Sequence, residues 1–135
     1  MLFRFPRLFR FPRNEERKAM TDNTRKMLLR LYTDENAHVG DQRVVDEIVR
    51  RAREAGLAGA TALRGRMGFG GKAAPIHHHH ALGVGDNLPI VVEIVDSESK
   101  LRYFVEQRLG DLHHIGLITL ERVEVLTRGV PEQER

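Results

Sequence analysis

Apolar residues in this chain change between helical and strand-like spacing, and the order of these segments predicts an α+β fold of the type βαββαβ. Four short aliphatic runs have the length and composition of strands, and two longer stretches have the periodicity of amphipathic helices. The length of 135 residues fits one domain. Its core must be built from Leu, Val and Ile, because the chain has no Trp and few aromatic residues.

The first strand is expected at residues 26–32, where the run KMLLRLY is rich in Leu. The first helix is expected at about residues 42–55, because apolar side chains recur there at helical spacing with Arg and Glu on the other side. Asp41 is suited to the N-cap of this helix, and Gly56 to the left-handed residue after its end. Residues 60–64 are the second expected strand.

The third strand is expected at residues 88–95, in which every second residue is apolar on one face. Asp96 or Ser97 is suited to cap a second helix, and the last strand is expected at residues 119–126. The apolar stripe of the second helix consists of Leu101, Phe104, Val105, Leu109 and Leu112. Two helices on one face of a four-stranded antiparallel sheet form the ferredoxin-like arrangement, which this order predicts.

The sheet face that the helices leave open carries apolar residues as well. Alternation places Leu28, Arg30 and Tyr32 of the first strand and Val91, Glu93 and Val95 of the third on this face. Apolar residues on both faces indicate that other subunits bury the open face. Arg30 and Glu93 lie on strands that are neighbours in this topology, so they either form an ion pair or remain as two solvated surface charges.

Charge divides the chain into parts of different character. Residues 1–26 hold eight Arg or Lys against three acidic residues, a balance of +5, so the net charge of +3 leaves −2 for the rest. We therefore expect a disordered basic tail or a start codon placed too early at residues 1–25, one domain at residues 26–128, and a flexible C-terminus at residues 129–135. The body does not have the charge of a nucleic-acid binder.

The tail contains a tandem repeat, because LFRFPR occurs at Leu2–Arg7 and again at Leu8–Arg13. Proline in each copy excludes a central strand. The tail is either a disordered extension or an artefact of a start codon that belongs at Met20 or Met27. The alternative is a basic and aromatic anchor for membrane surfaces or nucleic acid.

Composition also limits the class of protein. The absence of cysteine excludes disulfides and thiolate zinc sites and fits a cytoplasmic protein. No apolar run reaches the length of a transmembrane helix, and the N-terminus lacks the apolar core of a secretory signal. No nucleophile stands beside a base: Ser97 and Ser99 are explained by helix capping. We therefore expect no enzymatic activity.

The loop between the second and third strands is the strongest functional signal in the sequence. More than 20 residues separate two short strands, whereas hairpin loops usually have two to five. Its first part is glycine-rich and basic, and glycine amides with arginine could cradle an anion. The alternative is a hinge that needs positive φ, with arginines for solubility. The candidate ligand-binding residues are Arg64, Gly65, Arg66, Gly68, Gly70, Gly71 and Lys72.

Four consecutive histidines, His77, His78, His79 and His80, stand in the middle of the same loop. In extended backbone two imidazoles would point to each side, where they could share Zn²⁺, Ni²⁺ or Cu²⁺. His113 or His114 of a neighbouring subunit could supply a third ligand. The alternative is a solvated loop whose charge changes near pH 6.5.

Four segments together resemble one known family. They read LLRLY, AREAGLAGATALRG with MGFG, LPIVVEIVDSESKL, and GLITLERVEVL. They are similar to the PII-like proteins of domain-of-unknown-function family 190, over the stretch from Lys26 to Leu126. The resemblance implies a ferredoxin-like subunit in a trimer whose sheets face inward. It also implies signal transduction of the nitrogen-regulatory type, with adenine nucleotides bound in clefts between subunits and targets contacted by the long loop.

One feature of the PII proteins is missing. They carry a glycine- and lysine-rich phosphate loop before the last strand, where this chain reads HHIGLITL with only Gly116. The expectation is thus a homotrimeric regulator that senses a small anion, such as an adenine nucleotide, and contacts a partner protein through residues 65–87. The sequence does not indicate any particular cofactor. A metal-binding protein that uses the histidine loop and a structural trimeric adaptor are the alternatives.

Overall fold

A computed structural model describes residues 25–70, 77–78 and 87–126 of the chain. Residues 1–24 of the predicted tail at residues 1–25, and all of the predicted flexible end at residues 129–135, lie outside these ranges. The elements are β1 (Lys26–Asp34), β2 (His38–Val39), β3 (Gln42–Arg43), α2 (Val44–Glu54), β4 (Thr61–Arg64), β5 (Met67–Gly68), β6 (His77–His78), β7 (Pro89–Ser97), α3 (Glu98–Tyr103), the π-helix η1 (Phe104–Arg108) and β8 (Leu117–Val123).

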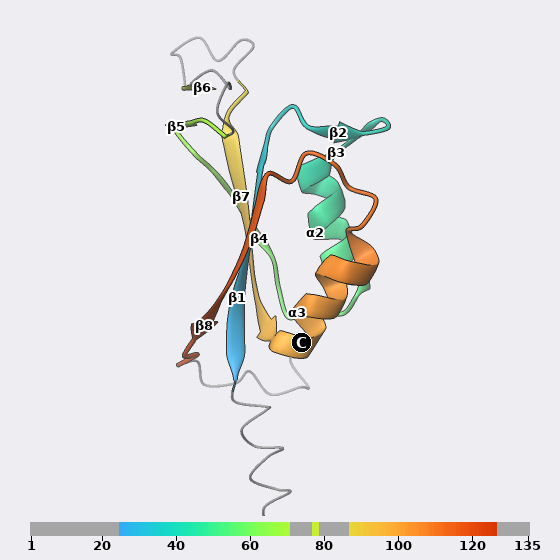
Figure 1. Cartoon of the computed structure of the whole chain (residues 1–135), viewed down its shortest axis with the longest axis vertical. Coiled ribbons are helices and arrows are strands. Elements are labelled where there is room, and N and C mark those ends of the chain that lie inside the picture. The colour runs from blue at the N-terminus through green and yellow to red at the C-terminus, as the bar shows by residue number, and fades with distance from the viewer. Residues whose placement is uncertain (1–24, 71–76, 79–86, 127–135) are drawn as a thin grey trace, which may run out of the picture.

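The main sheet has four strands in the order β4-β7-β1-β8, and every neighbouring pair is antiparallel. Both α2 and α3 lie on the same side of this sheet (Figure 1). The predicted four-stranded antiparallel sheet and two helical segments are therefore confirmed. The predicted pairing of the first and third strands is also confirmed, because β1 pairs with β7. Two short ribbons, β2-β3 and β5-β6, were not predicted.

The core lies between the helices and the inner face of β1 and β7. Leu31 and Val92 are directly opposite in the register of these strands, and neither is exposed. The predicted alternation holds in β7, where Ile90, Val92 and Ile94 are buried and the residues between them are partly exposed. In the second helix, the predicted stripe is buried at Leu101, Phe104, Leu109 and Leu112, while Val105 packs on the edge of the core.

The start of α2 differs from the prediction. Asp41 is not its N-cap, because the helix begins at Val44 and Arg43 holds the cap position without a side-chain hydrogen bond. The preceding residues form the β2-β3 hairpin instead, with Gly40 at φ +58° in its turn. Gln42 and Arg43 pair with β2 in this hairpin, so they are not available for the first turn of the helix. At the other end the prediction is confirmed, because Gly56 has φ +73° and donates its N–H to the carbonyl of Arg53.

The second helical segment begins after Ser97, as predicted, but the Ser97 side chain makes no capping hydrogen bond. The neighbouring Asp96 carboxylate accepts the N–H of Ser97 with Oδ1 and the N–H of Ala58 with Oδ2. After six residues the α-helix continues as the wider π-helix η1. In the described parts of the chain, no helix is long and apolar enough to cross a membrane.

Candidate functional site

A cavity of about 680 Å³ opens where β1 and β4 begin and β7 ends. Its lining includes Lys26 of β1, Lys100 of α3, Thr61 of β4, and Glu93 and Asp96 of β7. Ligand pockets for small molecules typically measure about 300–1,000 Å³ and combine apolar surface with a few polar groups. The volume and the mixed lining of this cavity fall within that description.

One wall of the cavity is the turn between α2 and β4, residues 56–60. Gly56 ends the helix with positive φ, and the Leu57 N–H donates to the carbonyl of Ala52. Asp96, which is only 5% exposed, then holds the turn against β7 by accepting the Ala58 N–H at 2.9 Å. A buried carboxylate that accepts two backbone N–H groups fixes the shape of this wall.

The chemistry of the cavity suits an anion with polar substituents. The ammonium groups of Lys26 and Lys100 supply positive charge, and the Thr61 hydroxyl can donate or accept. Glu93 contributes a carboxylate that is engaged by Arg30 at 3.0 Å. None of these residues belongs to the predicted ligand-binding set. The available signal was the GLAGAT segment after the first helix, which is part of the family resemblance.

The predicted anion loop lies at the other end of β4 (Figure 1). Its first glycine has a packing role: the Gly65 N–H donates to the Pro89 carbonyl at 2.7 Å, and a Cβ there would lie 2.7 Å from Pro89 Cγ. At Gly68 a Cβ would lie 3.2 Å from the same atom. These two glycines allow the loop to pass close to Pro89.

The alternative interpretation of this loop as a hinge with positive φ is wrong for the glycines that the structure describes. Among described residues, φ is positive only at Gly40, Gly56 and His114. A Cβ at Gly70 would meet nothing within 4 Å. Gly71 and Lys72 lie outside the described residues. The predicted nest is therefore only partly available to a ligand, because the Gly65 N–H is already bonded.

The base of the long loop is tied to the turn that follows β1. Arg64 Nε lies 2.5 Å from Glu35 Oε1, and the Glu35 N–H donates to the Leu88 carbonyl at 2.9 Å. The Asn36 N–H donates to Asn87 Oδ1 at 2.9 Å. Both legs of the loop thus meet the same short turn.

Arg66, the other predicted arginine, is exposed.

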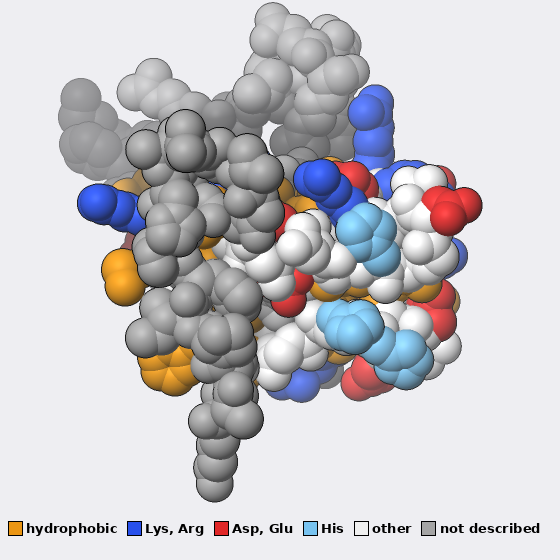
Figure 2. All heavy atoms as spheres, turned by 90° about the horizontal axis from the view of Figure 1, so that it is seen from above, with side chains coloured by type: hydrophobic (Ala, Val, Ile, Leu, Met, Phe, Trp, Pro, Cys, Tyr) orange, Lys and Arg blue, Asp and Glu red, His pale blue; other side chains and the backbone are white. Residues whose placement is uncertain are grey.

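Histidines gather at the same end of the molecule as the loop. β6 pairs with β5 so that His78 is opposite Met67 and His77 is opposite Gly68. Figure 2, which is the view onto this end, shows histidine side chains on its surface. Within the described ranges, no group of three or more His, Cys, Asp or Glu is arranged to hold a metal ion. His79 and His80 lie outside those ranges, so the predicted metal site stays a prediction.

The expected ion pair on the open face of the sheet is confirmed. Arg30 Nε lies 3.0 Å from Glu93 Oε1, and Arg30 Nη1 lies 2.5 Å from Glu121 Oε1. The two carboxylates raise the pKa of Arg30, mainly through the hydrogen bond to Glu93. Apolar side chains surround this charged centre in the same register: Leu28, Tyr32, Leu63, Val91, Val95 and Leu117. In the single chain, Leu63 is 48% exposed and Leu117 is 54% exposed.

Comparison with known proteins shows the family of this chain. The profile of the DUF190 family, described as "Uncharacterized ACR", matches residues 26–125. The chain belongs to the DUF190 family. It is 41% identical over 102 residues to a UPF0166 protein of Aquifex aeolicus, a match that covers 76% of this chain and 94% of that relative. A second UPF0166 protein of the same organism is 29% identical over 101 residues, which cover 75% of this chain and 97% of the relative.

Proposed function

We propose that this DUF190 protein is a PII-like, homotrimeric regulator that binds a small anionic ligand in the cavity beside Lys26 and Lys100. In this proposal the subunits have the ferredoxin-like fold and meet through their open sheet faces. The loop at residues 65–87 contacts a partner protein. An adenine nucleotide is the ligand we test first, because the resemblance to PII proteins implies it.

The observation that carries the proposal is the cavity itself. Its volume of about 680 Å³ can accept a nucleotide-sized molecule, and two lysines lie among its lining residues. The lining also includes Glu93 and Val95 of the open sheet face. A ligand there would therefore lie beside the proposed subunit interface, where binding and assembly can influence each other.

The loop is proposed as the partner contact because its base presents apolar side chains to solvent. Met67 is 60% exposed and Phe69 is 70% exposed, although both are large apolar residues. Exposed apolar side chains beside arginines are common at protein interfaces. Ligand and partner would then bind at opposite ends of β4.

Titration calorimetry with ATP, ADP and AMP tests the ligand. We expect binding by at least one nucleotide, and we expect Lys100→Ala to weaken it by about 1.5–3 kcal/mol, the size of a hydrogen bond to a charged group. Arg102→Ala is the matched control, because Arg102 lies on the same helix and bonds Glu98. Absence of heat with all three nucleotides at millimolar concentration contradicts the nucleotide proposal.

Thermal-shift measurements separate the alternatives. A ligand that binds the folded protein raises its melting temperature. A rise with Zn²⁺ or Ni²⁺ but with no nucleotide would favour the metal-binding protein. A trimer that responds to neither class of ligand would favour the structural adaptor.

A further inference from the structure

The turn after β1 is a junction that holds both legs of the long loop. On the leg that enters the loop, Arg64 is paired with the Glu35 side chain. On the leg that leaves it, the Leu88 carbonyl accepts the Glu35 N–H. Glu35 therefore contacts one leg with its carboxylate and the other with its backbone. The two contacts are chemically separable, because only the first depends on the charge of the side chain.

The turn is built to keep Glu35 in place. The Asp34 Oδ1 atom accepts the N–H groups of Asn36 at 3.1 Å and Ala37 at 2.8 Å. This local bonding pattern is typical of an Asx turn. Asn36 is also tied to Asn87 of the leaving leg. The backbone of Glu35 is thus held in place, and this keeps its carboxylate within reach of the Arg64 guanidinium.

The two members of the pair differ strongly in exposure. The Glu35 side chain is 15% exposed, whereas the Arg64 side chain is 61% exposed. An oxyanion from solvent can therefore reach Arg64, but it must compete with Glu35 for the Nε–H, which is one of the two donors of a side-on bidentate contact. The guanidinium has five N–H donors and binds carboxylate or phosphate oxygens well. Arg64 is thus accessible to anions from solvent, although the Glu35 carboxylate of the same chain is already bound to it.

We propose that the Glu35–Arg64 ion pair is an autoinhibitory contact, in which Glu35 holds the Nε–H of Arg64 until an external phosphate or carboxylate displaces it from that donor. This inference rests on the proposed role of the loop base as a contact surface and adds its regulation. Displacement leaves the poorly exposed Glu35 carboxylate without its cationic partner, which is unfavourable. Anion binding at Arg64 is therefore coupled to the conformation of the turn at residues 34–37.

Glu35→Gln tests this coupling, because it removes the competing charge and keeps the backbone bond to Leu88. Inorganic pyrophosphate is the probe, and the ¹⁵N–¹H signal of the Arg64 Nε–H group is the readout. The pair is partly solvent-exposed, so we expect pyrophosphate to bind Arg64 of the variant about two- to fivefold more tightly than wild type. The amide signals of Glu35 and Asn36 should shift with the same dissociation constant in wild type.

Asp41→Asn is the matched control, because it removes one negative charge from an exposed residue of the nearby β2-β3 hairpin. It should leave the affinity unchanged, and Arg64→Gln should abolish the response. Equal affinities of wild type and Glu35→Gln overturn the proposal. Absence of any Arg64 response in both proteins overturns it too. The NMR titration follows Arg64 and does not depend on Lys100. Failure of the proposed ligand site beside Lys100 would therefore be detected separately, by the calorimetry.

Discussion

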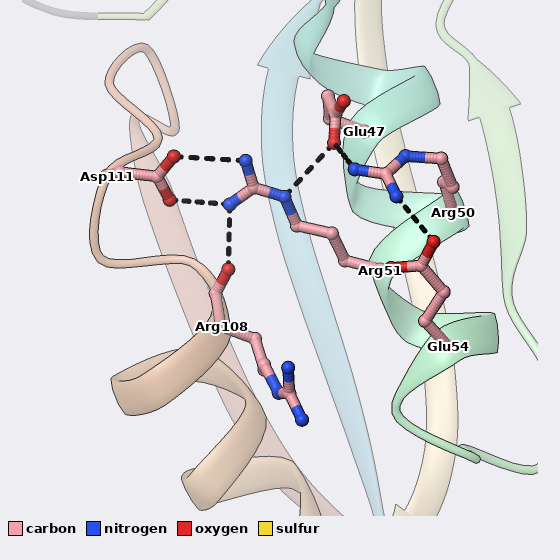
Figure 3. Close-up of polar contacts among 6 residues, drawn as sticks. All are labelled: Glu47, Arg50, Arg51, Glu54, Arg108 and Asp111. Atoms are coloured by element: carbon pink, nitrogen blue, oxygen red, sulfur yellow. Dashed lines mark hydrogen bonds and ion pairs between the residues drawn. The ribbon is translucent and has the colours of Figure 1, made fainter.

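Arg51 and Asp111, which are 60 residues apart in the sequence, are joined by two parallel hydrogen bonds (Figure 3). Arg51 Nη1 lies 2.5 Å from Asp111 Oδ1, and Nη2 lies 3.0 Å from Oδ2. Arg51 also donates to the Arg108 carbonyl at 2.8 Å and to Glu47 Oε2 at 3.0 Å. This one guanidinium therefore ties α2 to the end of η1.

The pairing makes stability depend on pH. The Arg51 guanidinium lowers the pKa of Asp111 in the folded protein, and Arg50 and Arg51 lower the pKa of Glu47. A carboxyl with a lowered pKa in the folded state stabilises the fold above its unfolded pKa of about 3.9, and this stabilisation disappears as the pH falls through the folded value. We therefore expect Asp111→Asn to melt at a lower temperature than wild type at pH 7, with the difference vanishing towards pH 2.

Thermal melts at several pH values check this prediction. Glu54→Gln is the control, because Glu54 bonds only to Arg50 of its own helix in the described structure and is 61% exposed. It should melt close to wild type at every pH. A gap between Asp111→Asn and wild type that persists at pH 2 would contradict the explanation. High salt should narrow the gap at pH 7, since the Asp111 side chain is 62% exposed.

Gly65→Ala should destabilise the protein by about 1–3 kcal/mol, the usual cost of forcing an extra carbon into a packed site. The reason is the distance of 2.7 Å between the new Cβ and Pro89 Cγ. Urea denaturation measures the difference. Gly70→Ala is the matched control, because a Cβ there has nothing within 4 Å. Equal stability of the two variants would show that Pro89 moves aside without cost.

Val91→Asp should dissociate the proposed trimer. Val91 lies on the open sheet face, opposite Tyr32 in the register, and a carboxylate buried there without a partner would cost several kcal/mol. Light scattering coupled to size exclusion measures the mass. Ser99→Asp introduces the same charge at an exposed position of α3 and should leave the assembly intact. A wild-type monomer at micromolar concentration would refute assembly through this face.

Deletion of residues 1–24 should leave the melting temperature within about 2–3 °C of wild type, because surface changes usually alter stability by less than about 0.5 kcal/mol. Two observations motivate this expectation: the proline-broken LFRFPR repeat and the start of the family match at residue 26. Differential scanning calorimetry of both proteins gives the answer. A larger drop would mean that the deleted residues pack on the domain.

The main elements and the two faces of the sheet follow from patterns in the sequence. Strand periodicity assigned Ile90, Val92 and Ile94 to the core, and it assigned Arg30 and Glu93 to the other face of their strands. Gly56 marked the end of α2 correctly. These features are local, because side-chain alternation and the conformational freedom of glycine act within a few residues.

The candidate sites, by contrast, depend on how the elements pack together. Lys26, Thr61 and the Asp96–Lys100 segment are far apart along the chain, and they line one cavity because antiparallel pairing brings the start of β4 beside the end of β7. The sequence suggested that Gly65 contributes to an anion nest, and the structure adds a close approach of Pro89 to this glycine. Likewise, no local pattern pairs Arg64 with Glu35 or Arg51 with Asp111. Such contacts join residues distant in sequence, so they depend on the packing of whole elements.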